Sequence, residues 1–170
     1  GKAQHGRLHV MDAAYFHRME AMEFALAHDD GHLIERLNEA DIVLVGVSRT
    51  SKTPTCLYLA NRGIRAANVP LVPGVPPPEL LWHLTRPLVV GLTKDPDRLV
   101  QIRRNRIAML YPSAITDYVD PEQVRMEVQE ARRLFGRSGW PVIDVTRRAI
   151  EETAAEIIGL LARRHPHVAV

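Results

Sequence analysis

The pattern of apolar and polar positions predicts a helical segment at the start of the chain. Residues 11–28 have apolar side chains at helical spacing, and they end in a polar stretch with a glycine that is typical of a helix exit. The buried stripe of this helix is expected to consist of Tyr15, Met19, Met22 and Leu26. A short helix is expected to follow at residues 32–38.

From residue 41 onward the pattern changes to strands that alternate with helices. Residues 41–47 are a continuous, mostly β-branched run, which is typical of a strand buried on both faces of a parallel sheet. Further strands are expected at residues 67–72, 88–92 and 142–145. Helices are expected at residues 52–62, 79–84 and 149–164 and after the Asp-Pro pairs 95–96 and 120–121, the last of these ending near Gly139.

This alternation predicts an α/β fold, with a mostly parallel sheet and helices on both of its faces. Ligands of such sheets bind at the carboxyl ends of the strands. The loop that follows the first predicted strand is therefore the first place to look for chemistry.

That loop matches most of the phosphate-loop pattern G-x-x-x-x-G-K-[ST] between a buried strand and a helix. Ser51 stands at the second glycine of the pattern, where it keeps its backbone N–H but restricts the backbone conformation. We expect Lys52 to reach the terminal phosphates and Thr53 to ligate Mg²⁺. The residues expected to bind phosphate are Gly46, Val47, Ser48, Arg49, Thr50, Ser51, Lys52 and Thr53.

The fold is therefore expected to be of the phosphate-loop kinase type. Residues 1–40 would be an N-terminal helical segment and residues 41–170 the nucleotide-binding α/β domain, which together form one compact domain. An ordinary strand-to-helix turn rich in capping hydroxyl groups is the alternative for the loop.

Several charged residues are further candidates for the site. Asp29 and Asp30 could hold Mg²⁺ or accept a proton from a hydroxyl nucleophile, or they could simply end a helix. Asp95 and Asp144 are candidates for a second metal-associated carboxylate, although Asp95 also suits a helix cap and Asp144 a satisfied polar group in a strand. Arginines in the helix after Asp95 could contact phosphates, or could form a solvated helix face; they are Arg103, Arg104 and Arg106.

The amino-acid composition argues against two classes of function, binding to nucleic acids and binding to membrane surfaces. The 170 residues have a formal net charge of +2, which favours neither a nucleic-acid-binding nor a membrane-surface protein, and no apolar run is long enough to span a membrane. The single cysteine, Cys56, cannot form an internal disulfide and indicates a reducing cytoplasm. Of 22 basic residues only Lys2, Lys52 and Lys94 are lysines, and one of them occupies the phosphate-loop position.

The motifs together resemble the bifunctional regulatory proteins of pyruvate, phosphate dikinase, of which a related branch regulates phosphoenolpyruvate synthase. The resemblance runs from about residue 6 to residue 158, and residues 71–76 look more like the dikinase branch. The segments that carry it are residues 25–31, 40–55, 58–63, 67–76, 90–93, 101–103 and 143–154.

The resemblance implies a serine/threonine kinase that uses ADP and inactivates its target by phosphorylating a threonine. It also implies the reverse reaction, in which inorganic phosphate takes the phosphoryl group and leaves as pyrophosphate. ADP would lie on residues 46–53, with Mg²⁺, and catalysis would involve Lys52 and either Asp29 or Asp30. The partner would be pyruvate, phosphate dikinase or phosphoenolpyruvate synthase.

Relatives in this family carry roughly another domain's worth of residues ahead of the matching region, so the chain resembles a carboxyl-terminal part. Ala149 and Cys56 replace residues that are often serine in the family, and neither is needed by the mechanism. Without the resemblance, a small-molecule kinase or a non-catalytic ADP-binding module would also fit. The sequence leaves the oligomeric state open.

Overall fold

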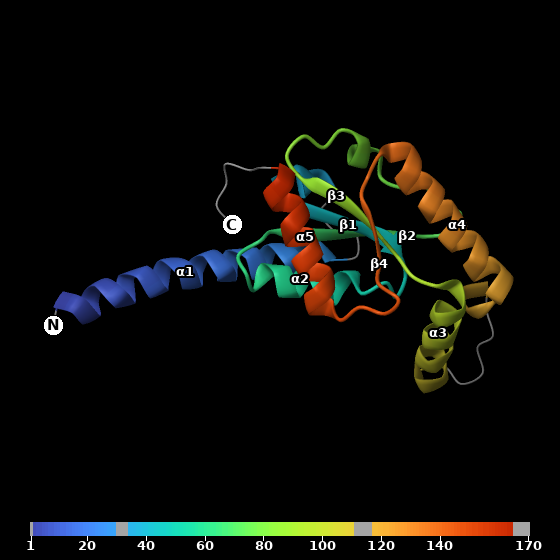
Figure 1. Ribbon diagram of the computed structural model, residues 1–170, viewed down its shortest axis with the longest axis horizontal. Helices are drawn as coiled ribbons and strands as arrows, with labels where there is room; N and C mark the ends of the chain where they lie inside the picture. The colour runs from blue at the N-terminus through green and yellow to red at the C-terminus, as the bar shows by residue number, and fades with distance from the viewer. Residues whose placement is uncertain (1, 30–33, 111–116, 165–170) are drawn as a thin grey trace.

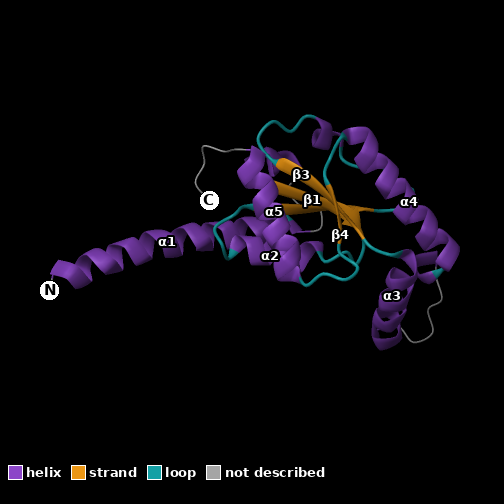
Figure 2. Ribbon diagram, in the orientation of Figure 1, coloured by secondary structure: helices purple, strands orange, loops and turns teal. Residues whose placement is uncertain are grey.

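The computed structural model describes residues 2–29, 34–110 and 117–164 and has the expected α/β architecture. Its sheet consists of four parallel strands in the order β2-β1-β3-β4 (Figure 2). The strands are β1 (Ile42–Val47), β2 (Ala66–Leu71), β3 (Leu88–Thr93) and β4 (Val142–Asp144). Each strand begins and ends within one residue of its predicted bounds, so the fold-class prediction is confirmed.

The central strand β1 is buried along its whole length because helices cover both faces of the sheet. Ile42 and Leu44 point to the face that is covered by α2 (Lys52–Ala60) and α5 (Ile150–Arg164), where Leu59 and Ile157 meet them. The opposite face packs on α4 (Pro121–Ser138), next to α3 (Pro96–Leu110) (Figure 1). Alternate residues of one strand thus supply two separate cores.

The ends of α4 follow the predicted signals. The side chain of Asp120 accepts a hydrogen bond of 2.9 Å from the backbone N–H of Glu122, and Pro121 occupies the first turn. Gly139 ends the helix with a left-handed φ of 69°. The predicted short helices at residues 32–38 and 79–84 are the 3-10 helices η2 (Ile34–Glu39) and η3 (Glu79–Trp82), and a third, η4 (Asp117–Val119), precedes α4.

The prediction of a buried stripe on the first helix is wrong. Helix α1 (Lys2–Ala27) is longer than expected and extends away from the body, and only its last turns pack against the rest of the molecule (Figure 1). Its buried residues are Ala21, Phe24 and Ala25, and His28, directly after the helix, is buried as well. Small alanines let α1 approach Ala60 of α2 closely, whereas Tyr15, Met19 and Leu26 are exposed and Met22 is only half-buried.

No helix within the described residues is both long and apolar enough to cross a membrane.

The contact between β3 and α4 at Gly91 leads to a stability prediction. A Cβ atom on Gly91 would lie 2.5 Å from the ring of Phe135, which is fully buried. We expect Gly91→Ala to lower the free energy of unfolding by about 1–3 kcal/mol, because the ring cannot move without disturbing a packed core.

Gly136→Ala on α4 is the matched control, since its Cβ would have no neighbour within 4 Å. Replacing a helical glycine by alanine there should raise stability by about 0.5–1 kcal/mol. Urea unfolding of both variants gives the comparison. A Gly91→Ala variant as stable as the unsubstituted chain would show that this contact is not tight.

Candidate phosphate-binding site

The loop between β1 and α2 has the backbone shape that a phosphate cradle requires. Arg49 and Ser51 both have positive φ angles, of 70° and 65°, on either side of Thr50. Left-handed residues next to right-handed ones turn successive N–H groups toward one side and form an anion-binding concavity. The loop also leads into the N-terminus of α2, where the helix dipole favours negative charge.

Gly46 sets how closely the loop lies on the sheet. A Cβ atom there would be 2.7 Å from the carbonyl oxygen of Leu92 and 2.9 Å from the hydroxyl of Thr50. The Thr50 hydroxyl donates to the Val47 carbonyl at 2.8 Å and so closes the loop from within. The first glycine of the pattern is therefore required for space, whereas the second is replaced by Ser51 at the cost of a strained φ.

Lys52 folds back along the loop that precedes it. Its ammonium donates a 2.8 Å hydrogen bond to the carbonyl of Val47, and its Nζ lies 3.4 Å from the Thr50 hydroxyl oxygen. The side chain is only 6% exposed, so the charge is held at the base of the cradle.

Asp29 lies against the loop from the end of α1. Its Oδ1 accepts hydrogen bonds from the Thr53 hydroxyl at 2.7 Å and from the Asn68 side-chain amide at 2.5 Å. The structure thus brings Asp29, Lys52 and Thr53 into one site, as the sequence predicts, and adds Asn68 from β2. Asp30 lies outside the described residues.

Lys94 is a site residue that the sequence reasoning did not select. It follows β3 directly, and parallel pairing of β3 with β1 brings it to the wall of the pocket that Lys52 also lines. Burial lowers the pKa of Lys94, the charge of Arg98 lowers it further, and Asp144 acts in the opposite direction. The signal was the scarcity of lysine, because two of the three lysines meet here.

The pocket formed by these groups has a volume of about 620 Å³, within the usual range for small-ligand sites. It combines two ammonium groups with one carboxylate at the end of the sheet where strands of this fold present their ligands. Its lining residues are Asp29, Ser48, Arg49, Ser51, Lys52, Thr53, Pro54, Pro70, Lys94 and Ile102.

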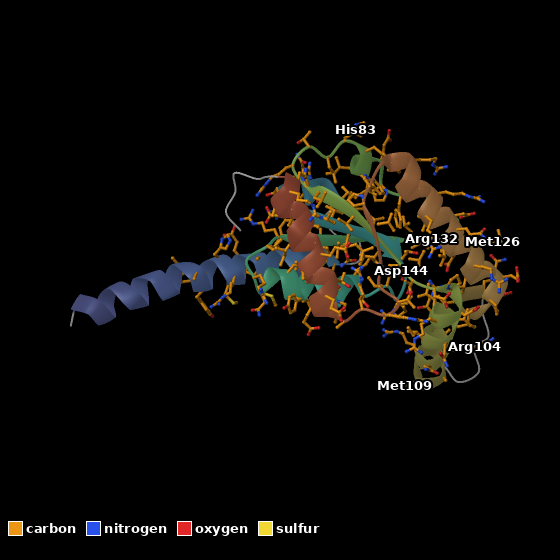
Figure 3. All side chains as sticks on the ribbon, viewed as in Figure 1. His83, Arg104, Met109, Met126, Arg132 and Asp144 are labelled. Atoms are coloured by element: carbon orange, nitrogen blue, oxygen red, sulfur yellow. The ribbon has the colours of Figure 1, made fainter. Side chains whose placement is uncertain are left out.

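Arg103 is fully buried and contacts the protein instead of lining the pocket, which differs from the sequence expectation. Its guanidinium donates to the carbonyls of Ser48 at 3.2 Å and Tyr118 at 3.1 Å and pairs with Glu127 at 2.5 Å. Arg103 therefore holds the phosphate loop from behind. Arg104 and Arg106 are exposed on α3. Figure 3 shows Arg104 on the side of the molecule away from the projecting part of α1.

Asp95 and Asp144 lie together in a neighbouring pocket that shares no lining residue with the first. Thr146 joins them, since its hydroxyl donates to Asp144 at 2.5 Å and accepts from the Asp95 N–H at 2.8 Å. Burial raises the pKa of Asp144, but hydrogen bonds from Thr146 and the charges of Arg132 and Arg148 outweigh it and lower the pKa overall. Figure 3 shows Arg132 next to Asp144.

Neither aspartate joins Thr53, and within the described residues no three His, Cys, Asp or Glu side chains cluster as metal ligands would. Asp95 also accepts a hydrogen bond from the Arg98 N–H at 3.1 Å, as the cap of α3. The remaining oxygen donors suited to Mg²⁺ are Asp29 and Thr53, and a cation there would need phosphate and water to complete its shell.

Cys56 is buried under the loop, as expected. Burial, with the nearby charge of Asp29, raises the pKa of its thiol to about 12, although Lys52 acts in the opposite direction. A thiol with this pKa stays protonated at neutral pH and does not serve as a nucleophile.

The parallel sheet and the cradle at the end of its central strand define an α/β fold of the phosphate-loop kinase type. A family model described as kinase/pyrophosphorylase matches residues 1–158, and the chain belongs to this family.

Three similar proteins carry the same name. Proteins of Sphingopyxis alaskensis and Caulobacter vibrioides are 60% and 59% identical over 96% and 92% of this chain, and both are named as pyruvate, phosphate dikinase regulatory proteins. A protein of Paramagnetospirillum magneticum with the same name is 61% identical over 93% of the chain. The aligned part of the chain spans 60%, 50% and 51% of these three relatives.

The left-handed backbone at Ser51 gives a test of the cradle. A side chain at a φ of 65° strains the loop, and glycine would remove that strain. We expect Ser51→Gly to leave the free energy of unfolding unchanged or to raise it by up to about 1 kcal/mol, and Ser51→Val to lower it by more than 1 kcal/mol.

Calorimetric unfolding of the two variants measures this difference. Thr55→Val is a useful control, because it places the same side chain at a buried position with ordinary helical backbone. If Ser51→Val were as stable as Ser51→Gly, the left-handed conformation would not be a constraint on the loop.

Proposed function

We propose that the chain is the phosphotransferase part of an ADP-dependent serine/threonine kinase and phosphate-dependent pyrophosphorylase. Its target is a threonine of pyruvate, phosphate dikinase, whose activity it switches off and on. Membership of the kinase/pyrophosphorylase family and the names of similar proteins support the class of reaction and the target.

The observation that carries the proposal is the meeting of Lys52 and Lys94 at a phosphate cradle. ADP and pyrophosphate share a diphosphate, in which two anionic groups are joined by one oxygen. Loop N–H groups and Lys52 suit one phosphate of this unit, and Lys94, which lines the same pocket, suits the other. One pocket would then serve both directions of the reaction.

In the forward direction the threonine hydroxyl attacks the β-phosphorus of ADP. A bond forms between the threonine oxygen and phosphorus, the bridging P–O bond breaks, AMP leaves, and the hydroxyl proton passes to a base. Catalysis of such a transfer consists mainly of positioning and charge stabilisation. Lys52 is the residue suited to stabilising the charge on the phosphoryl group in transit.

In the reverse direction inorganic phosphate attacks the phosphorus of phosphothreonine. The new P–O–P linkage forms pyrophosphate, and the threonine oxygen leaves and takes up a proton. One carboxyl group serves as the base in one direction and as the acid in the other. It belongs either to Asp29, which accepts a hydrogen bond from the Thr53 hydroxyl, or to Asp30, the next residue in the sequence.

Asp29 and Thr53 are the residues that would hold Mg²⁺ beside the phosphates. The cation would neutralise charge on the phosphate oxygens. Phosphoenolpyruvate synthase as the target, a small-molecule acceptor and ADP binding without turnover are the rival functions. Incubation of the chain with each target enzyme and either ADP or ATP, followed by location of any phosphothreonine, separates them.

The shared pocket predicts that loss of Lys52 affects both directions. Lys52→Ala should lower the rate of ADP-dependent phosphorylation and of phosphate-dependent dephosphorylation by about 100-fold or more, because each loses the same stabilising charge. Arg104→Ala, which removes an exposed cation that does not line the phosphate pocket, should change neither. A variant that loses the kinase reaction and keeps phosphorolysis would rule out one shared site.

Lys94 should give pyrophosphate binding a characteristic pH dependence. Lys94 attracts the anion only while its amine is protonated. Because its pKa is lowered, Lys94 loses this charge at a lower pH than an ordinary lysine does. Lys94→Met should weaken binding by about 10- to 100-fold at pH 7.

Lys94→Arg should keep the affinity at higher pH, since arginine does not deprotonate there. Isothermal titration with pyrophosphate between about pH 7 and 10 measures all three proteins. Parallel curves for the unsubstituted chain and Lys94→Arg would show that Lys94 does not contact the anion.

A further inference from the structure

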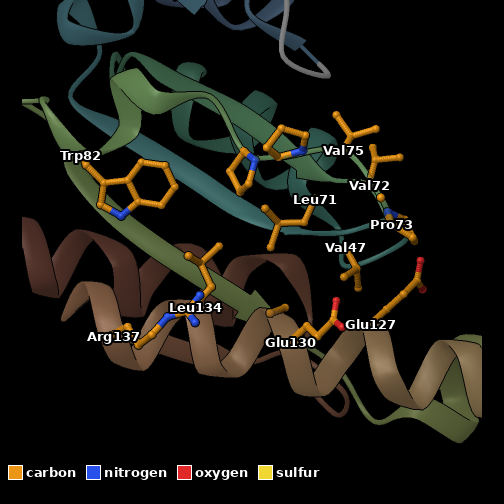
Figure 4. A pocket seen from close by; sticks show the side chains of 14 residues that line it. Val47, Leu71, Val72, Pro73, Val75, Trp82, Glu127, Glu130, Leu134 and Arg137 are labelled. Atoms are coloured by element: carbon orange, nitrogen blue, oxygen red, sulfur yellow. The ribbon is translucent and has the colours of Figure 1, made fainter.

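A second cavity lies beside the phosphate loop, between α4 and the segment that follows β2. It has a volume of about 380 Å³, and Figure 4 shows the side chains that line it. Leu71 and Val75 line one wall and Leu134 the other, with Trp82 at one end. We call this cavity the α4 groove.

The wall that faces α4 is rigid. Pro73, Pro76 and Pro77 fix the backbone of the segment after β2, and Gly74 turns the chain with a φ of 76°. Prolines also present no N–H group that would need a partner in an apolar cavity. The groove is therefore formed before anything binds, so binding would cost little ordering of this wall.

Apolar side chains at this groove are unusually exposed for their size. Val72, Val75 and Trp82 are 50%, 60% and 45% exposed, although each lies next to another apolar side chain. Exposed apolar surface of this kind, with a polar edge, is typical of sites that bind another molecule.

The charge of the groove differs along its length. Glu127 and Glu130 line it from α4 toward the Val47 end, whereas Arg137 lies on the side of Trp82 (Figure 4). Glu127 is paired with Arg103, whereas Glu130 is exposed and takes part in no ion pair among the described residues. Near Glu130 an anion such as a nucleotide phosphate would be repelled, and a basic side chain would be attracted.

The two cavities meet at the end of β1. Val47 lines the α4 groove, and the next residue, Ser48, lines the phosphate pocket. Figure 4 shows Val47 and Glu127 near the same end of the groove, away from Trp82. A chain that lies along the groove therefore ends at the phosphate loop.

We propose that the α4 groove binds an extended, mainly apolar segment of the protein substrate, with a basic side chain at Glu130, and so directs the acceptor hydroxyl to the phosphate loop. The inference rests on the proposed function, because it assigns an acceptor to that reaction. A nucleoside base is the other occupant that an apolar cavity could take, and the test below includes it.

The test uses two dye-labelled octapeptides that are identical, mainly of valine and leucine, apart from one central arginine or glutamate. Fluorescence anisotropy should show that the arginine peptide binds the chain about fivefold or more tightly, since it gains an ion pair where the other is repelled. Glu130→Arg should reverse the preference.

Two controls separate the groove from the rest of the surface. Glu122→Arg makes the same charge change on α4 outside the groove and should leave the preference intact. Val75→Asp should weaken both peptides, whereas Met126→Asp, at an exposed apolar residue outside the groove, should weaken neither. Circular dichroism of each variant confirms that it is folded.

The inference is overturned if neither peptide binds, if Glu122→Arg acts like Glu130→Arg, or if ADP displaces the bound peptide. Pyrophosphate titrated into the same proteins tests the proposed function separately. If the chain binds the peptide but no pyrophosphate, the proposed function is contradicted and the assignment of the α4 groove stands. If it binds pyrophosphate but no peptide, the assignment of the groove is overturned and the proposed function stands.

Discussion

Strand β1 is hydrogen-bonded on both edges to parallel strands and covered on both faces by helices, so its carboxyl end is fixed in three dimensions. In a parallel sheet β3 ends at the same edge as β1, and this places Lys94 at the wall of the phosphate pocket, while Asn68 within β2 holds Asp29. The parallel pairing of β1 with its neighbours thus determines where the groups of the phosphate pocket meet.

The loop itself is held from several directions because its own backbone is strained. Gly46 allows close contact with Leu92, Lys52 bonds to the carbonyl of Val47, and Arg103 bonds to the carbonyl of Ser48. The left-handed residues Arg49 and Ser51 would not keep their conformation without such contacts. A buried arginine that supports the loop also ties it to Glu127 of α4, and so links the phosphate pocket to the wall of the α4 groove.

Strand bounds, helix caps and the phosphate loop could be predicted from sequence because each depends on local signals, such as the β-branched run of β1 and the cap at Asp120. The stripe on α1 could not, because burial depends on which part of a helix meets the body, and small alanines were the contacting residues. The contacts of Arg103 were not predicted, and Lys94 was not selected, for a related reason. A basic residue binds an anion or supports a loop according to its surroundings, which only the packing of α3, α4 and β3 defines.

The two cavities differ in charge at the end of β1. Lys52 and Lys94 in the phosphate pocket suit a diphosphate, whereas Glu130 in the α4 groove repels it and Arg137 lies farther along, on the side of Trp82. A phosphate-bearing substrate is therefore favoured in the phosphate pocket. An acceptor that carries apolar and basic side chains is favoured in the α4 groove instead. Because Arg103 contacts both Ser48 and Glu127, its removal would leave the mostly buried carboxylate of Glu127 unpaired and the loop without this tether. The separation of donor from acceptor therefore depends on the same buried contact that keeps the loop in shape.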